Sequence, residues 1–182
     1  MQSSLRGVQL DEKDAFGHFA LALNYHYSGA IEQAAQAAEK AVNVCPSFAL
    51  GHLALGMARL YAGDAAGAID PLQRGLRMNP FDPLNFHWFR SLALAFYFAG
   101  KPAEGLSAAV RASQVRPAWR PALEAMIVCQ VALGRLDEAR QRAHQVRWLG
   151  KSDNDGLDQL RTRRPSWAND MATALRAGGV PD

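Results

Sequence analysis

Residues 47–80, SFALGHLALGMARLYAGDAAGAIDPLQRGLRMNP, decide the fold of this chain. Gly63 lies in the middle of the stretch, Ala68 follows it five positions later, and Pro80 closes it. Glycine ends a helix at little steric cost because it can take a left-handed conformation, and proline cannot continue a helix. The stretch therefore predicts two helices joined by a turn at Gly63, with the second helix ending before Pro80.

The same three markers recur along the chain in one register. Turn glycines are separated by 34, 37 and 34 residues, and they are Gly29, Gly63, Gly100 and Gly134. A small residue follows each glycine five positions later, at Ala34, Ala68, Gly105 and Ala139. Closing prolines keep the spacing at Pro46, Pro80 and Pro117, whereas the fourth copy has Lys151. A fixed period of this length is typical of helical repeats. We expect helix pairs at 15–28 with 31–44, 49–62 with 65–78, 84–99 with 102–115, and 118–133 with 136–149.

The first helix of each pair also carries a small residue where it would meet the second helix. These residues are Ala22, Gly56 and Ala93 in the first three copies. Small side chains at such a crossing let two helices approach closely. The fourth copy has Ile127 instead, so we expect its helices to pack more loosely or at a changed angle.

The end of the chain reads as a cap for the last pair, since a helical stack exposes apolar surface at its ends. We expect a short helical stretch near 157–163 and then a helix led by Pro165, with Ser166 as its N-cap. Trp167, Met171 and Leu175 would share one face of this helix, and Gly178-Gly179 would end it. The predicted organisation is a lead-in at 1–14 that reads as the end of a preceding helix, four units within 15–151 at about 15–48, 49–85, 86–119 and 120–151, and loop and capping helices at 152–182.

With this spacing of small residues, turn glycines and closing prolines, the chain resembles the tetratricopeptide repeat (TPR) family over residues 15–151. The resemblance implies an all-α fold, a right-handed α-solenoid of about four helix-turn-helix repeats with a C-terminal capping helix. The tail RTRRPSWANDMATALRAGGVPD, residues 161–182, is similar to the end of the repeat regions that follow class III nucleotide cyclase or winged-helix domains in bacterial regulators. That second resemblance implies a regulatory region without catalytic residues.

Composition and motifs indicate a globular protein without a cofactor. Hydrophobic residues make up 49% of the chain and charged residues 20%, which is ordinary for a folded domain. No segment reads as a signal peptide or a membrane span, so we expect a cytoplasmic protein. Cys45 and Cys129 match no metal or redox spacing and read as free thiols. Motifs for phosphate binding, zinc-dependent hydrolysis or a serine nucleophile are absent from the sequence, so we expect no enzyme, no catalytic residue and no cofactor.

Metal and nucleic-acid binding have little support. His18 and His52 share a phase in successive repeats and could approach one another, but no third ligand accompanies them. In residues 151–162, a calcium loop would place Lys151 and Thr162 at its first and last ligand positions, which excludes such a loop. The first helices of the first two repeats offer only Arg59 for phosphate contacts. We therefore expect no metal site and no nucleic-acid partner.

The family resemblance implies a concave groove lined by the first helix of each repeat. Transferred by phase, the candidate groove residues are Phe16, Phe19, Leu23, Tyr27, Leu50, Leu53, Met57, Tyr61, His87, Arg90, Leu94, Phe98 and Glu124, with Arg120 and Val128 beside them. Because most are apolar or aromatic, we expect a peptide or helix held by area and shape, with Arg90 and Glu124 setting its orientation. The alternative is that many of these side chains form the core between repeats.

The sequence thus favours a non-catalytic scaffold for protein–protein interaction. Two alternatives stay open. The chain is the regulatory C-terminal region of a bacterial cyclase-like protein or transcriptional regulator, or it is a self-association module that buries Phe16 and Phe19 against a second copy in a homodimer.

Overall fold

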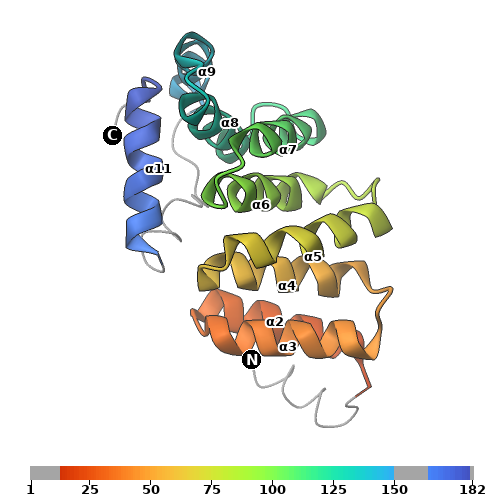
Figure 1. Ribbon diagram of the computed structural model, residues 1–182. Coiled ribbons are helices and arrows are strands. Elements are labelled where there is room, and N and C mark those ends of the chain that lie inside the picture. Colours follow the sequence, from red (N-terminus) through yellow and green to blue (C-terminus); the bar gives the residue numbers. More distant parts are fainter. Residues whose placement is uncertain (1–12, 150–163, 181–182) are drawn as a thin grey trace. The chain divides into compact units, whose positions relative to one another are not determined.

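The computed structural model describes residues 13–149 and 164–180, and this part of the chain is helical without any strand. It divides into two compact units, Met1–Asp82 and Pro83–Asp182. The first unit contains α2 (Ala15–Ser28), α3 (Ile31–Val44), α4 (Ala49–Ala62) and α5 (Ala65–Met78). The second contains α6 (Asn85–Phe98), α7 (Pro102–Val115), α8 (Arg120–Ala132), α9 (Leu136–Trp148) and α11 (Pro165–Ala177). Within each unit, consecutive helices pair side by side, as α2 with α3 and α6 with α7 (Figure 1).

The turn inside each pair is built by a glycine in the left-handed conformation. Gly29, Gly63, Gly100 and Gly134 have φ of 85°, 95°, 75° and 73°. At the first turn, the Gly29 amide donates to the His26 carbonyl and the Ala30 amide donates to the Tyr25 carbonyl. The other three turns repeat this pair of hydrogen bonds. The pattern is a Schellman motif, which satisfies carbonyls that a helix end would leave without a donor.

Small residues bring the two helices of a pair into close contact. A Cβ atom placed on Gly56 of α4 would lie 2.4 Å from Leu72 Cγ and 3.0 Å from the Ala68 carbonyl oxygen, both in α5. The third pair meets in the same way, since a Cβ on Gly105 would lie 2.9 Å from the Ala93 carbonyl oxygen. The absence of a side chain at these two glycines is therefore a packing requirement of the repeat.

The fourth pair accommodates a larger residue at the equivalent position. Ile127 is fully buried, as is Ala139 in the helix that faces it. The Ile127 side chain occupies the space beside Gly178, where an added Cβ would lie 2.5 Å from Ile127 Cγ2. The turn that ends α11 therefore provides the room for this isoleucine, and the side chain is as tightly enclosed as its small counterparts.

The helix starts differ in how they are capped. The Asp14 carboxylate accepts from the Phe16 amide at 3.0 Å, and the Asp64 carboxylate accepts from the Gly67 amide at 2.8 Å. The N-cap of α11 is Arg164, with Pro165 as the first helical residue, so the expectation of Ser166 as N-cap is wrong. Proline suits the first helical position because its missing amide proton would have no partner there. The expected lead-in up to residue 12, the short stretch near 157–163 and Lys151 lie outside the described residues.

Candidate functional site

The first helices of the first unit, α2 and α4, lie against each other and carry a partly open apolar surface. Phe16 and Tyr27 are 61% and 68% exposed, which is unusual for large aromatic residues. Three further apolar side chains are half-buried, and together the five residues define what we call the first-unit face: Phe16, Leu23, Tyr27, Leu50 and Met57. All five belong to the groove positions expected from the repeat phase.

Three other expected groove residues of this unit are packed inside it. Leu53 is 1% exposed, and its side chain fills the space over Gly75, where an added Cβ would lie 2.4 Å from Leu53 Cγ. Tyr61 is 4% exposed, and its ring centroid lies 5.0 Å from that of His26. Phe19 is buried against Phe48, with ring centroids 5.8 Å apart. These side chains hold the unit together and offer little area to a partner.

Sequence reasoning missed two aromatic residues that stand just before a first helix. Phe48 precedes α4 and packs edge-on against both Phe16 and Phe19 of α2. Trp119 precedes α8 and packs edge-on against Phe86 and His87 of α6. Both residues stand directly before a first helix, at the same position of their repeats. Comparing the repeats at that position would therefore have identified them. Phe48 orients the exposed Phe16 ring at one end of the first-unit face.

Two of the equivalent positions of the second unit carry charged and buried side chains, those of Glu124 and Arg90. Glu124 is 2% exposed and accepts a hydrogen bond from Arg120 Nε at 2.7 Å. Arg90 is also buried, whereas His87 is exposed at the start of α6. One side of the His87 ring packs against Phe86 and Trp119, and this partial burial, followed by the nearby Arg90 and Arg116 guanidinium groups, lowers the pKa of His87. Its imidazole is therefore neutral at physiological pH. The buried Arg90 and Glu124 side chains therefore act within the unit, and only His87 is open to solvent.

The last two expected groove residues of the second unit differ in surroundings. Leu94 is fully buried. Phe98, at the end of α6, is half-buried because the Trp167 ring of α11 stacks on it, with centroids 4.1 Å apart and an angle of 11° between the rings. The capping helix therefore covers the aromatic residue that the phase assigns to the groove.

Neither a metal site nor a basic stripe forms from the residues considered for them. The His52 ring lies 2.8 Å from the Pro46 carbonyl oxygen through Nε2, and His18 is buried in α2. No group of three or more metal-ligating side chains occurs within the described residues. Arg59 is engaged by Glu39 at 3.2 Å and by the Gly67 carbonyl oxygen at 3.3 Å. In the same part of the chain, no helix is long and apolar enough to cross a membrane.

The two thiols differ sharply in surroundings, and we expect them to differ in reactivity. Burial raises the pKa of Cys129 to about 12, while Cys45 is half-buried beside Ser47. A thiol reacts as its thiolate. A disulfide reagent at mildly alkaline pH should therefore modify one thiol per native chain and both in urea. A Cys45→Ala chain should not react until it unfolds, and rapid native modification of that variant would contradict this assignment.

The raised pKa also predicts how stability depends on pH. The folded state favours the protonated Cys129 thiol, so its stabilising contribution is complete below the unfolded-state pKa of about 8.5. It is lost as the pH rises from there toward the folded value of about 12. A Cys129→Ala chain should lack this part of the alkaline decline when urea unfolding is compared across that range.

No protein family model matches the sequence, and no curated protein matches it. Solved structures do match. The type IV pilus biogenesis factor PilW aligns with a TM-score of 0.74 at 16% identity, covering 97% of this chain and 80% of that chain. YrrB, described as a TPR protein with an unusual peptide-binding site, aligns with a TM-score of 0.69 at 18% identity, covering 97% and 92%. A thermophilic TPR protein of Thermus thermophilus, TTC0263, aligns at 0.65 and 19%, covering 95% and 87%. These likenesses confirm the expected fold class, an all-α solenoid of TPR repeats.

Proposed function

We propose that this chain is a non-catalytic scaffold that binds an apolar peptide or helix of another protein on the first-unit face. The observation that carries the proposal is the exposure of Phe16 and Tyr27 beside three half-buried apolar side chains on α2 and α4. Large exposed apolar side chains that share a helix face are typical of a binding site. Its aromatic residues are of the type that dominate binding energy at interfaces.

The surroundings of this face favour an apolar ligand over a charged one. None of its five residues is charged, and Arg59, the one arginine of α4, is held by Glu39 of α3 and Gly67 of α5. A segment that buries apolar side chains here would gain affinity from area and shape. The fold supports the same role. YrrB resembles this chain over nearly the whole length of both proteins, and it is described as having an unusual peptide-binding site.

A peptide-display selection on the full chain would test this function. We expect enriched peptides to carry two or more large apolar residues. Met57→Glu, which places a charge on the half-buried centre of the face, should weaken their binding by about 10- to 100-fold, since burying one large apolar side chain contributes about 1.5–3 kcal/mol.

The matched control is Gln36→Glu, which adds the same charge to an exposed position of α3. It should leave peptide affinity unchanged. Circular dichroism and the melting temperature would show that both variants are folded. Equal affinities of the two folded variants, or a selection that enriches only charged peptides, would contradict the proposed site.

A second candidate follows from the tail sequence at residues 161–182. We propose that the scaffold serves as the regulatory C-terminal region of a bacterial cyclase-like protein or transcriptional regulator. The reading frame upstream of Met1 would decide this: a cyclase or winged-helix domain there supports the idea, and an unrelated upstream gene opposes it. Self-association is the third candidate, and light scattering by the purified chain distinguishes a dimer from a monomer.

A further inference from the structure

Helix α11 is placed differently from the helices that begin each repeat. Of the helices that precede them in their own unit, α4 packs more on α3 than on α2, and α8 packs more on α7 than on α6. Each new first helix therefore lies chiefly on the preceding second helix. By contrast, α11 contacts mainly α8, the first helix of the last repeat. The second helix, α9, meets the turn after α11, where Arg147 Nη2 donates to the Gly179 carbonyl oxygen at 2.8 Å.

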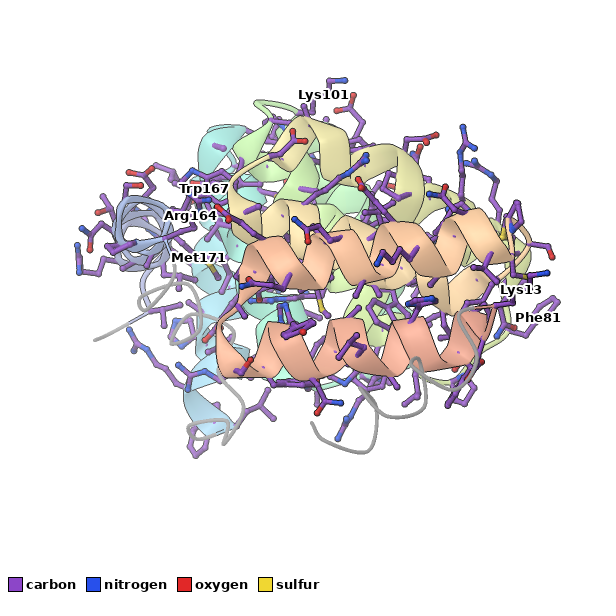
Figure 2. The ribbon with its side chains drawn as sticks, turned by 90° about the horizontal axis from the view of Figure 1, so that it is seen from below. Lys13, Phe81, Lys101, Arg164, Trp167 and Met171 are labelled. Atoms are coloured by element: carbon purple, nitrogen blue, oxygen red, sulfur yellow. The ribbon has the colours of Figure 1, made fainter. Side chains whose placement is uncertain are left out.

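All three residues of the apolar stripe of α11 pack against the rest of the second unit. Met171 and Leu175 are buried, and Trp167 stacks on Phe98 of α6. Figure 2 looks nearly along α11 and shows Trp167 and Met171 on the side that faces the rest of the second unit. At the other end, Gly178 lies directly on Ile127 of α8. We call the surface formed by Tyr97, Phe98 and Ile127 the α11 seat.

A charged residue and a closed turn accompany this apolar seat. Burial, and then the charge of the Asp170 carboxylate on α11, raise the pKa of Tyr97. The α11 helix ends in a Schellman motif, with the Val180 amide donating to the Leu175 carbonyl at 2.9 Å. Val180 itself is buried. The seat therefore receives a complete helix with an aromatic residue at its start and a glycine turn at its end.

The described helices of the first unit, α2 to α5, leave the equivalent positions partly exposed. Leu23 of α2 and Met57 of α4 are half-buried, whereas Val128, in the same phase of α8, is fully buried. The first helices of the repeats thus carry apolar residues at matching positions in both units. In the second unit, the chain's own α11 packs on such a helix, as a bound amphipathic helix would.

We propose that the α11 seat is a helix-binding site that the chain keeps filled with α11, and that its partner is an amphipathic helix of another protein. The partner would carry an aromatic residue, a methionine or leucine, and a leucine at successive four-residue steps, the pattern of Trp167, Met171 and Leu175. It would displace α11 and take its contacts. Because a tethered helix competes at high effective concentration, the site would stay closed to weak ligands.

The test uses the full chain and a fluorescent peptide of residues 164–180 as the probe. In Trp167→Ala/Met171→Ala, the tethered helix loses the ring that stacks on Phe98 and the buried Met171 side chain, so the seat should become available. We expect this variant to bind the probe at least about tenfold more tightly than the wild type, since affinity scales with the fraction of open sites. The matched control, Ser166→Ala/Asn169→Ala, changes two exposed positions of α11 and should bind the probe like the wild type.

A third substitution shows whether the probe binds at the α11 seat. Adding Phe98→Ala to the Trp167→Ala/Met171→Ala chain should reduce probe binding at least about tenfold, because the stacking partner of Trp167 is removed. Met57→Glu, on the first-unit face, should leave probe binding unchanged, which separates this site from the proposed peptide site. A folded Trp167→Ala/Met171→Ala chain that binds no better than the wild type would overturn the proposal. Dimerisation of that chain without probe would also overturn it, since the occupant would then be a second copy.

Hydrogen exchange on the wild-type chain tests the same idea if that variant does not fold. A displaceable helix opens without global unfolding. The amides of α11 should therefore exchange at least about tenfold faster than those of α8. Equal protection of the two helices would show that α11 is a permanent part of the core and would overturn the proposal.

Discussion

Replacing Gly56 by leucine is expected to lower the free energy of unfolding by about 3 kcal/mol, at the upper end of what overpacking costs. The Cβ alone would lie 2.4 Å from Leu72 Cγ and 3.0 Å from the Ala68 carbonyl oxygen. Leu72 is fully buried and the carbonyl belongs to a helix, so neither can move away cheaply. The remaining atoms of leucine would force α4 and α5 apart. Urea unfolding followed by circular dichroism measures the loss.

Two further variants show whether the loss comes from this crossing. Gly56→Ala adds only the Cβ and should cost less than Gly56→Leu, although alanine is the better helix former. Ala66→Leu puts the same leucine on an exposed position of α5 and should change stability by no more than about 0.5 kcal/mol. An unchanged unfolding midpoint for Gly56→Leu would mean that α4 and α5 do not meet at this residue.

The helices could be predicted because their boundaries depend on local residues. Gly29, Gly63, Gly100 and Gly134 each form the expected turn, and their left-handed conformation is a property of glycine itself. The helices of the first unit begin and end at the predicted residues. In the second unit, α6 and α8 are one to two residues shorter at each end than predicted, 85–98 against 84–99 and 120–132 against 118–133. Such ends depend on capping contacts that a spacing pattern does not contain.

The exposure of the candidate groove residues could not be predicted from phase. Tyr27 and Tyr61 occupy the same position in successive repeats, yet Tyr27 is 68% exposed and Tyr61 is 4% exposed. His26 packs edge-on against both rings, but only Tyr61 is otherwise enclosed. Burial depends on which neighbours surround a residue, and these neighbours differ between successive repeats. The position of a residue within a repeat therefore predicts which way its side chain points, but it does not predict how much of that side chain is exposed to solvent.

The place of α11 was likewise beyond the sequence pattern. The spacing of Trp167, Met171 and Leu175 predicted an apolar stripe, and in the structure Met171 and Leu175 are buried while Trp167 stacks on Phe98. The surface that they cover depends on Phe98 and Ile127, which are distant in sequence. Ile127 broke the repeat rule, and the reason is visible only once Gly178 is placed beside it. A departure from a repeat pattern can thus mark the contact of a non-repeat segment.

Removing the Glu124 carboxylate is expected to cost about 3–5 kcal/mol of stability, the loss typical of breaking a buried ion pair from one side. The Glu124 side chain is 3% exposed, that of Arg120 is 19% exposed, and their N–O distance is 2.7 Å. In Glu124→Ala, the Arg120 guanidinium would lose this carboxylate while staying mostly out of water. Glu124→Gln keeps an acceptor oxygen but no charge, so it should lie between the wild type and the alanine variant. Urea unfolding again gives the free energies.

The chain contains its own control for this ion pair. Arg74 and Asp70 are also four residues apart on one helix, with an N–O distance of 2.9 Å, but their side chains are 54% and 66% exposed. Water already solvates both charges there, so Asp70→Ala should cost no more than about 0.5 kcal/mol. Arg120→Ala in the Glu124→Ala background should recover part of the loss, because it removes the charge left behind. Equal losses of unfolding free energy in Glu124→Ala and Asp70→Ala would mean that water reaches the ion pair on α8. That result would contradict the burial of the Glu124 and Arg120 side chains.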